Sequence, residues 1–386
     1  MEKLLQFDGK NLYCGGISAD ISDTAISQYC QTHIQGKPVI LYGTGSMGVW
    51  LLQEFEYAGI PVAAVCDTYK KEIRFGERVR PVDPLPEALS KYSDAYVLVS
   101  SISFYDEIFK MVQAYIPKER ILNIQDLAAE IPVAAGYTYR NYVIEHLDTL
   151  NWLAEILEDE QSREVLREVV LGRISRDSSR FSRIASPCPY FTSDIVQLRE
   201  DETFIDGGAY IGDTIADFMR ETKGAFRKIF SFEPDKKHCE QICRTYADLL
   251  AQDRLAVFQK GLWSCRETLR FIENDSGSFL TTDPHKNDFI VETVSLDDCC
   301  IAEPVSFIKL DIEGSELQAL QGARQLICKN RPVLAICVYH KIEDLVEIPR
   351  YIHSLQPGYR YYLRHHGSLI YDTVFYAIPE ERVKHN

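Results

Sequence analysis

Short apolar runs alternate with amphipathic stretches over two long blocks of the chain. In the first block, apolar runs at 37–42, 61–66, 96–100 and 120–124 are separated by turns and by segments with helical spacing. In the second block, the apolar runs lie at 203–206, 228–232, 255–258, 305–310 and 332–338. Strands that alternate with helices are typical of parallel α/β sheets. Both blocks are therefore predicted to be α/β.

The stretch between the two blocks has a different pattern. Over residues 138–185, apolar side chains recur at three- and four-residue spacing among many charges, which predicts helices. We therefore divide the chain into an N-terminal extension (1–34), a smaller Rossmann-like parallel domain of the nucleotide-binding type (35–130), a helical connector (131–199) and a larger domain (200–386). The larger domain has a predicted hairpin near 269–271 and a closing β pair near 359–364 and 373–378, so its strands suffice for a seven-stranded Rossmann-like sheet.

Composition and charge narrow the function classes. The chain has 57 acidic and 42 basic residues, a formal net charge of -15, which disfavours a nucleic-acid partner because phosphate binding needs clustered Lys and Arg. Apolar runs fall short of the ~20 residues of a membrane helix. The eleven cysteines form no CxxC pair, so we expect them to behave as small apolar residues in a reducing compartment. The sequence predicts a cytoplasmic protein without a membrane span.

A glycine-rich turn at 206–214 follows the first strand of the larger domain. Asp206 ends the strand, Gly207, Gly208, Ala209 and Gly212 form the turn, and a helix is predicted near Asp213 or Thr214, either of which could cap it. Glycines allow backbone N–H groups to approach a ligand, and a helix N-terminus offers unpaired donors. The pattern indicates a nucleotide-type site.

One strand later, Glu233 stands at a strand end, 27 residues after Asp206. One β-α-β crossover has about this length, so both acids are predicted at the same sheet edge, where a carboxylate can hold the two hydroxyls of a ribose. The alternative is that Glu233 faces solvent before Pro234. A glycine turn followed by an acid suits either NAD or S-adenosylmethionine.

The larger domain resembles the FkbM family of methyltransferases over about 200–378. The resemblance is carried by residues 204–214, 232–234, 294–297, 307–316, 320–323 and 331–332, and its most specific piece is Lys309-Leu-Asp-Ile-Glu-Gly-Ser-Glu316. Tyr210 stands where the broader methyltransferase pattern often has a second glycine.

The resemblance implies a methyltransferase that uses S-adenosylmethionine. Asp206, Gly208 and Gly212 resemble the cofactor loop, and Glu233 resembles the acid that binds the ribose. Methyl transfer to a hydroxyl of a sugar or other polyhydroxylated small molecule, free or as part of a glycan, is the activity we expect. The residues assigned to the cofactor are Asp206, Gly207, Gly208, Ala209, Gly212, Asp213, Thr214, Glu233 and Asp311.

Asp311, Glu313 and His340 are the predicted catalytic residues. A hydroxyl acceptor must lose a proton, and His340 follows a buried strand with an ordinary pKa of ~6.5, which suits a base. The alternatives are a strand-end histidine and helix-capping acids, with Glu316 completing the cap. A metal held by Asp311, Glu313, His340, His365 and His366 is a further alternative, because linear spacing cannot show whether they converge; we assign no metal ligands.

Residues 361–366 could line the acceptor pocket. Tyr361 and Tyr362 could stack on a sugar, and Arg364 could meet an anionic group, beside His365 and His366. The alternative is a tyrosine-rich edge strand.

The N-terminal block has a glycine pattern of its own. Gly43, Gly45 and Gly48 form a GxGxxG between a predicted strand and helix, and Asp67 ends the next strand. This context resembles a dinucleotide or nucleotide-sugar domain. An NAD-linked oxidoreductase or a nucleotide-sugar-binding protein is therefore one alternative function, and a non-catalytic binding or scaffold protein is another.

Overall fold

The computed structural model describes residues 3–9, 11–20, 25–57, 59–75, 78–101, 104–123, 137–175, 179–274, 277–281, 289–355 and 358–383. The chain divides into two compact units, which are Met1–Leu147 with Val170–Asp177, and Asp148–Val169 with Ser178–Asn386. The helical segment in the middle of the chain is shared between them. The domain boundaries expected from the sequence stay a prediction.

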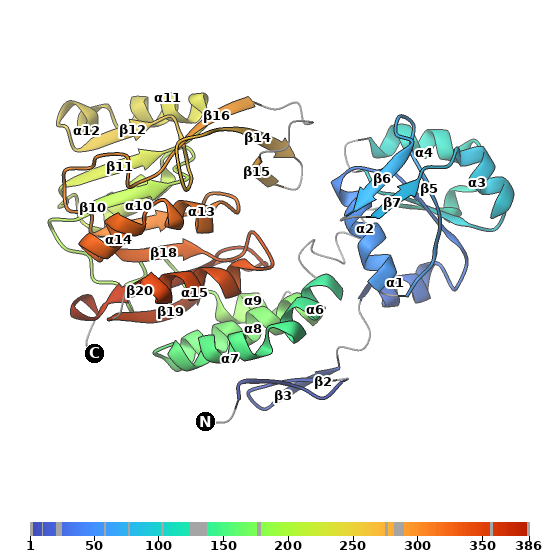
Figure 1. Ribbon diagram of the computed structural model, residues 1–386, viewed down its shortest axis with the longest axis horizontal. Coiled ribbons are helices and arrows are strands. Elements are labelled where there is room, and N and C mark those ends of the chain that lie inside the picture. The colour runs from blue at the N-terminus through green and yellow to red at the C-terminus, as the bar shows by residue number, and fades with distance from the viewer. Residues whose placement is uncertain are drawn as a thin grey trace. The chain divides into compact units, whose positions relative to one another are not determined.

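The first unit contains a parallel sheet of four strands in the order β5-β4-β8-β9, as predicted for the smaller α/β domain. Helices α1 to α4 alternate with or flank these strands (Figure 1). A three-stranded antiparallel sheet of β1, β2 and β3 precedes it. The bounds are β1 Leu5–Phe7, β2 Asn11–Cys14, β3 Ile17–Asp20, α1 Ala25–His33, β4 Val39–Tyr42, α2 Ser46–Tyr57, β5 Val62–Cys66, β6 Glu72–Phe75, β7 Arg78–Pro81, α3 Leu85–Lys91, β8 Tyr96–Val99, α4 Tyr105–Gln113, β9 Ile121–Asn123 and α6 Tyr137–Glu145.

The second unit is built on a seven-stranded sheet, which confirms the predicted fold class. Its order is β12-β11-β10-β17-β18-β20-β19, and only β20 runs antiparallel to its neighbours. The central strands are buried on both faces, which explains why they read as unbroken apolar runs in the sequence. The strands are β10 Thr203–Gly207, β11 Lys228–Phe232, β12 Leu255–Phe258, β17 Phe307–Leu310, β18 Val333–Cys337, β19 Tyr359–His365 and β20 Thr373–Pro379.

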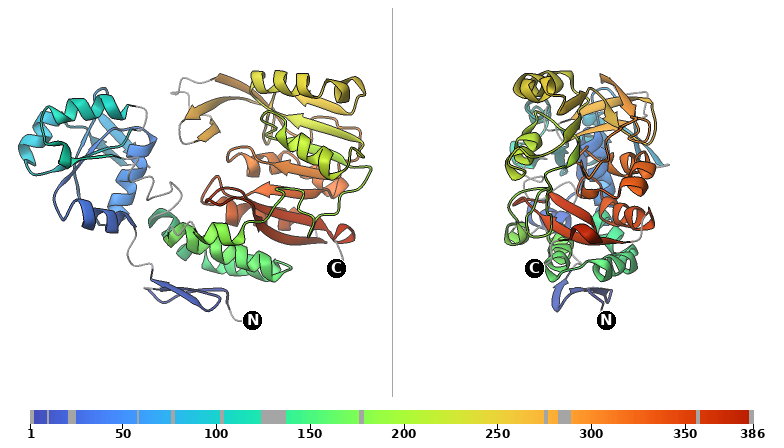
Figure 2. Two further views of the ribbon diagram at one scale, coloured as in Figure 1. Left: turned by 180° about the vertical axis from the view of Figure 1, so that it is seen from behind. Right: turned by 90° about the vertical axis from the view of Figure 1, so that its left-hand side faces the viewer.

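Helices cover both faces of this sheet. The right-hand view of Figure 2 shows α10 and α11 on one side and α13 to α15 on the other. On the first side, Phe218 of α10 stacks on Phe204 of β10 with ring centroids 4.6 Å apart, within a core that also holds Phe307. The helices are α10 Asp213–Glu221, α11 Lys236–Thr245, α12 Ala247–Ala251, α13 Glu316–Gln321, α14 Arg324–Asn330 and α15 Asp344–Leu355.

The segment of the chain between β12 and β17 forms a separate small sheet. It has the order β13-β16-β14-β15, and β14 and β15 form the antiparallel hairpin predicted near 269–271. Its strands are β13 Gly261–Leu262, β14 Thr268–Asn274, β15 Gly277–Thr281 and β16 Phe289–Val294. Gly261 and Leu262 bring the base of this sheet to the carboxyl edge of the large sheet, where the site lies.

Edge strand β19 is covered by the helical segment, which contains α7 Leu147–Ile156, α8 Glu160–Ser175 and α9 Ser179–Ile184. The Arg364 side chain on this strand is only 1% exposed and lies 2.6 Å from Asp159 and 2.7 Å from Asp194. Burying a guanidinium requires such partners, because an unpaired charge is costly away from water. Arg364 therefore fixes the helical segment to the sheet edge.

The ion pair makes stability depend on pH. Burial opposes the charge on Asp159, but hydrogen bonds from Arg364 and Ser162 outweigh burial and lower the pKa of this carboxyl. The pair therefore stabilises the fold above the ordinary pKa of an aspartate, and its contribution is lost as the pH falls through the lowered pKa. We expect Asp159→Asn to lower the free energy of unfolding by about 1–3 kcal/mol near pH 7 and by much less near pH 3.

Denaturant titrations of both proteins at the two pH values would measure this difference. The control is Asp201→Asn, which removes an acid that is 57% exposed and pairs with the half-exposed Arg199 and should change stability by less than about 1 kcal/mol. A loss in Asp159→Asn that is equally large in acid would contradict the ion-pair explanation.

Candidate active site

The glycine turn after β10 is folded tightly against the end of β17. Gly208 has φ +74°, and a Cβ atom there would overlap the backbone carbonyl oxygen of Asp311. Gly212 has φ +88° and is the N-cap of α10, in place of Asp213 or Thr214, which the sequence suggested. Glycine is needed at both places because its backbone adopts positive φ without strain.

Lys309 stabilises this turn from its buried side. Its side chain is 2% exposed, and its ammonium lies 3.2 Å from the Asp206 carboxylate and donates to the carbonyl oxygens of Gly207 at 3.1 Å and Gly208 at 2.7 Å. Burial opposes the charge, but Asp206 and Asp311 outweigh burial and raise the pKa of the ammonium. The Asp206 side chain is completely buried, so it shapes the turn from beneath.

Glu233 stands beside the turn, as its place one strand later predicts. Its two carboxylate oxygens accept hydrogen bonds from the backbone N–H of Tyr210, at 2.8 Å, and of Asp235, at 2.9 Å. Tyr210 adopts a left-handed backbone with φ +46°, the conformation that a second glycine would adopt easily. Burial raises the pKa of Glu233, and the two amide donors offset this in part. The alternative that Glu233 only faces solvent does not fit its burial.

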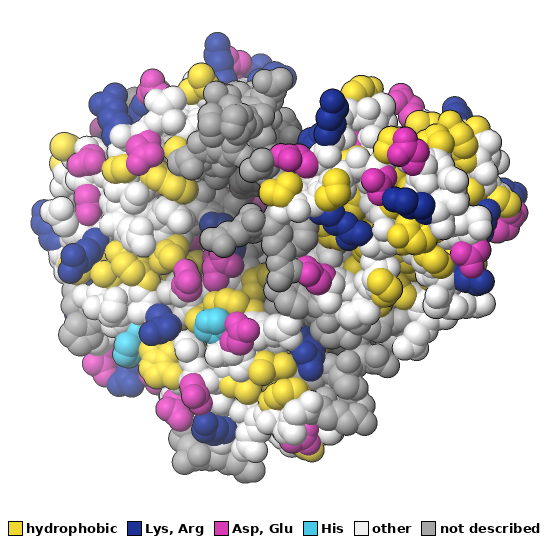
Figure 3. Space-filling view, turned by 45° about the vertical axis from the view of Figure 1, so that its right-hand side comes forward, with side chains coloured by type: hydrophobic (Ala, Val, Ile, Leu, Met, Phe, Trp, Pro, Cys, Tyr) yellow, Lys and Arg dark blue, Asp and Glu magenta, His cyan; other side chains and the backbone are white. Residues whose placement is uncertain are grey.

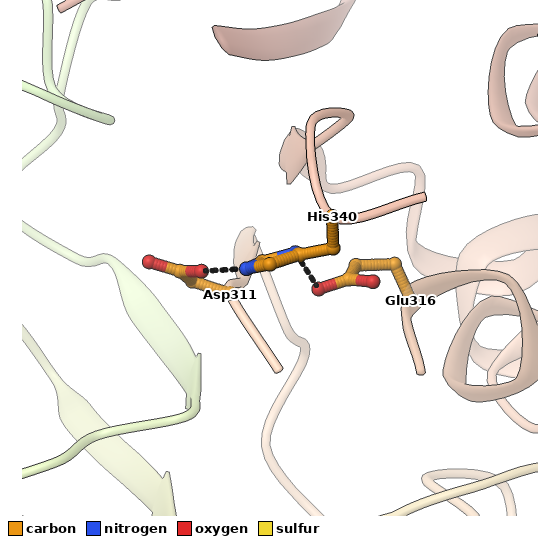
Figure 4. A group of neighbouring side chains, drawn as sticks. All are labelled: Asp311, Glu316 and His340. Atoms are coloured by element: carbon orange, nitrogen blue, oxygen red, sulfur yellow. Dashed lines mark ion pairs between the residues drawn. The ribbon is translucent and has the colours of Figure 1, made fainter. Parts of the chain in front are cut away.

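A second turn, between β17 and α13, carries a cluster of acids around His340. The imidazole Nε2 lies 3.3 Å from Asp311 Oδ1 and 3.5 Å from Glu313 Oε2, and Nδ1 lies 3.0 Å from Glu316 Oε1. Figure 4 shows the His340 ring between the carboxylates of Asp311 and Glu316. Burial disfavours the charged imidazole, but Glu316, Asp311 and Glu313 outweigh burial and raise its pKa to about 9.

The acids of this cluster differ in their surroundings. Asp311 accepts from the hydroxyl of Tyr190 at 2.7 Å and from that of Tyr339 at 3.0 Å. Glu316 is completely buried and accepts from the backbone N–H of Ile312 at 2.8 Å, at the start of α13. The Glu313 side chain is 51% exposed and has a left-handed backbone with φ +57°.

One pocket of about 640 Å³ joins the two turns. Gly208, Tyr210 and Glu233 line it beside the glycine turn, whereas Asp311 and Glu313 line it beside the second turn. Its lining includes seven carboxylates and two lysines, and both lysines are ion-paired, Lys260 with Glu292 and Lys309 with Asp206. The carboxylates are Asp213, Asp217, Glu233, Asp235, Asp311, Glu313 and Asp372. This charge balance suits a cationic or neutral ligand better than an anionic one.

The predicted residues at 361–366 do not form an acceptor site together. Tyr361, Tyr362, Arg364 and His365 are buried, and His365 Nδ1 lies 2.9 Å from the hydroxyl of Thr373. Arg364 cannot meet an acceptor anion because Asp159 and Asp194 already engage it. Of this group, only His366 lines the pocket. The structure therefore favours the reading as a tyrosine-rich edge strand.

Among the described residues, the cluster that could hold a metal consists of Asp311, Glu316 and His340. It includes Asp311 and His340 from the set considered in the sequence and adds Glu316, which the sequence suggested only as a cap. The sequence assigned no role to Tyr190 or Tyr339, and it named Lys309 only as the first residue of the family motif. Tyr190 is 121 residues from its partner Asp311, and no local pattern reports such a contact.

The N-terminal glycine pattern also forms a turn between a strand and a helix. A Cβ at Gly48 would overlap the carbonyl of Gly43, so this glycine serves helix–strand packing. The Asp67 carboxylate accepts from the backbone N–H and hydroxyl of Thr44, at 3.0 and 2.6 Å, and from the N–H groups of Tyr69 and Lys70. Asp67 thus binds its own loops, whereas Gly45 has open space around its Cβ position. Nucleotide binding here stays a prediction.

The face shown in Figure 3 has no concentrated basic area among its described residues. On the face shown in Figure 3, the described Lys and Arg side chains are interspersed with Asp and Glu rather than gathered in one area. Such mixed charge provides no continuous track for a phosphate backbone.

Within the part of the chain that the structure describes, no helix combines the length and the apolar character needed to span a bilayer.

Comparison with known proteins points to one family. The family model described as "Methyltransferase FkbM domain" matches residues 206–367. The crystal structure of methyltransferase FkbM from Methylobacillus flagellatus KT is 26% identical with a TM-score of 0.57, and the match covers 89% of this chain and 90% of that one. Among curated proteins, nothing matches the chain.

Two further solved structures resemble only part of the chain. An rRNA methylase from Streptococcus thermophilus is 15% identical over 47% of this chain and 86% of that one, with a TM-score of 0.30. SMU.1697c from Streptococcus mutans, in complex with SAH, is 12% identical over 48% and 93%, with a TM-score of 0.29. These scores are too low to support any argument about function.

The close approach of the two turns predicts a specific cost for a methyl group. Gly208→Ala should lower the free energy of unfolding by roughly 3–5 kcal/mol, because the new Cβ would overlap the Asp311 carbonyl and force the turns apart. Gly224→Ala is the matched control, since Gly224 has φ +77° and nothing within 4 Å of its Cβ position. It should cost only about 1–2 kcal/mol of backbone strain. Equal losses in the two variants would show that the turns do not need this contact.

Proposed function

We propose that this chain, an FkbM-family methyltransferase by the match at 206–367 and by its likeness to the methyltransferase from Methylobacillus flagellatus, transfers the methyl group of S-adenosylmethionine to a hydroxyl group. The acceptor is a sugar or another polyhydroxylated small molecule. The observation that carries the proposal is that one pocket is lined both by the glycine turn with Glu233 and by the acid turn with Asp311 and Glu313.

The residues around the glycine turn fit S-adenosylmethionine. Each oxygen of Glu233 accepts one backbone hydrogen bond and keeps a lone pair, so the carboxylate is held in place and can still accept from the two hydroxyls of a ribose. The pocket's carboxylates suit a ligand that carries a sulfonium and an ammonium. When bound, S-adenosylmethionine supplies an electrophilic methyl carbon.

The acid turn provides the groups for an acceptor hydroxyl. Both nitrogens of His340 face carboxylates, so we assign the proton acceptor to Glu313, whose half-exposed side chain lines the pocket. His340 is then a positioning residue that holds Asp311 and Glu313 on one side and Glu316 on the other. Asp311, fixed by two tyrosine hydroxyls, would orient the hydroxyl. Orientation of two reactants is a large part of the work in a displacement at carbon.

The pocket also narrows the acceptor class. Tyr190 and Tyr339 place phenol groups beside Asp311, a combination of ring and carboxylate that suits the alternating C–H and O–H groups of a sugar. A phosphorylated or nucleic-acid acceptor would meet seven carboxylates and two lysines. Like charges this close oppose binding, so a neutral acceptor is favoured.

The assignment of Glu233 can be tested by cofactor binding. Glu233→Gln keeps the side-chain shape but removes the charge, so the affinity for S-adenosylhomocysteine should fall by about 1.5–3 kcal/mol, or roughly 10- to 150-fold. Asp67→Asn is the control, because Asp67 also follows a glycine turn at a strand end, in the other unit. Calorimetry of the full chain measures both. Unchanged affinity in Glu233→Gln, or a loss in Asp67→Asn instead, would refute the assignment.

The assignment of Glu313 predicts a defect in turnover alone. Glu313→Gln should lower kcat by ~100-fold or more, because the hydroxyl keeps its proton, while affinity for S-adenosylhomocysteine stays within a few-fold of the original. Glu303→Gln, which removes an acid paired with Lys228 away from the pocket, should leave both values unchanged. Methyl transfer to candidate sugars is followed with labelled S-adenosylmethionine. Full activity in Glu313→Gln would exclude this carboxylate as the base.

A further inference from the structure

The acid turn and the neighbouring His340 bring carboxylate and imidazole donors close together. One ligand atom each from Asp311, Glu316 and His340 can be chosen so that all lie within 4.8 Å of one another. Glu313 adds a carboxylate oxygen 3.5 Å from His340 Nε2. Carboxylates and one imidazole are a donor set that suits divalent cations such as Mn²⁺ and Mg²⁺.

The cluster also carries more negative charge than its own cation balances. Asp311, Glu313 and Glu316 surround one imidazole, and even a protonated imidazole would leave two negative charges. Lys309 does not serve as the balancing cation, because its ammonium is 3.2 Å from Asp206 and donates to two turn carbonyls. A divalent cation bound to Nε2 in place of that proton would reduce the excess to one negative charge.

Hydrogen bonding within the cluster is incomplete. His340 is nine-tenths buried, and its ring lies between two carboxylates (Figure 4), with Nδ1 3.0 Å from Glu316 Oε1. The other oxygen of the fully buried Glu316, Oε2, has no hydrogen-bond partner. Buried polar atoms normally have a hydrogen-bond partner. A buried oxygen without one indicates that a further partner binds in this cluster, with a slight rearrangement of the side chains around it.

We propose that His340 Nε2 and Asp311 bind a divalent metal ion at the acceptor end of the pocket. Nε2 is the nitrogen that faces the two pocket-lining acids, whereas Nδ1 faces Glu316 at 3.0 Å. A metal-binding histidine normally has its second nitrogen held by a carboxylate, and a ligating carboxylate is normally hydrogen-bonded itself. Glu316 provides the first of these supports, and Tyr190 and Tyr339 provide the second.

The proposal rests on the proposed function and assigns the ion a role in it. Two protein ligands leave positions open for water and for an acceptor hydroxyl, as in Mg²⁺ sites that bind their substrate directly. Coordination makes the hydroxyl more acidic. Its O–H bond breaks with the proton passing to Glu313, the oxygen forms a bond to the methyl carbon, and the electron pair of the sulfur–methyl bond stays on sulfur. No electron is gained or lost by the ion.

Binding of Mn²⁺ to the full chain, without cofactor or acceptor, tests the site. After treatment with a chelator, the protein is titrated with Mn²⁺ while the signal of the free ion is followed by electron paramagnetic resonance. One ion per chain is expected. Asp311→Asn removes a ligand charge and Glu316→Gln removes the support of Nδ1, so each should weaken binding by about 10- to 100-fold.

Asp372→Asn is the matched control, because Asp372 lines the same pocket outside the cluster. It should change the affinity for Mn²⁺ less than about threefold. Thermal melting shows whether each variant is folded. Asp311→Asn and Glu316→Gln are isosteric changes, so they can test the site even if a larger change such as His340→Ala prevents folding.

Titration with S-adenosylhomocysteine separates this proposal from the proposed function. Protein that binds S-adenosylhomocysteine but takes up no Mn²⁺ at millimolar concentration would overturn the metal site and leave the methyltransferase proposal intact. Binding of Mn²⁺ that is lost equally in Asp372→Asn would also overturn it, because the ion would then respond to the general charge of the pocket. If Mn²⁺ binding is weakened in Asp311→Asn and Glu316→Gln but kept in Asp372→Asn, the result supports the site even when the cofactor does not bind.

Discussion

The contact between two turns at the carboxyl edge of the large sheet determines the rest of the site. Lys309, on β17, pairs with Asp206 on the neighbouring strand β10 and donates to the carbonyls of the glycine turn. Gly208 in return lies directly against the carbonyl of Asp311. One buried ammonium and one missing Cβ thus bring the glycine turn, to which we assign the cofactor, against the turn that carries the acids.

This arrangement follows from ordinary sheet topology. In a parallel sheet, the carboxyl ends of neighbouring strands lie at one edge, and ligands bind where the strand order reverses direction. Here β10 lies between β11 and β17, so the chain leaves β10 toward one side and returns on the other. Glu233 after β11 and Asp311 after β17 therefore flank the glycine turn, although they are 78 residues apart in the sequence.

Local patterns were sufficient for the fold and for part of the candidate site. Apolar runs, glycine positions and the spacing from Asp206 to Glu233 predict strands, a turn and an acid at one edge, and these depend only on neighbours in the sequence. The contacts of Tyr190 and Glu316 could not be predicted this way. Tyr190 reaches Asp311 from outside the sheet, and Glu316 looks like a helix-capping acid until His340 is seen beside it. The burial of Arg364 could not be predicted for the same reason, because its partners Asp159 and Asp194 lie 205 and 170 residues away in the sequence.

A crystal structure with S-adenosylhomocysteine tests the central claim most directly, which is that the glycine turn and the acid turn form one reaction site. The account predicts that the ribose hydroxyls lie within hydrogen-bond distance of Glu233 and that the sulfur faces Asp311 and Glu313. A ligand that instead occupies the N-terminal glycine turn at Gly43–Gly48, or one whose sulfur faces away from the acid turn, would contradict it.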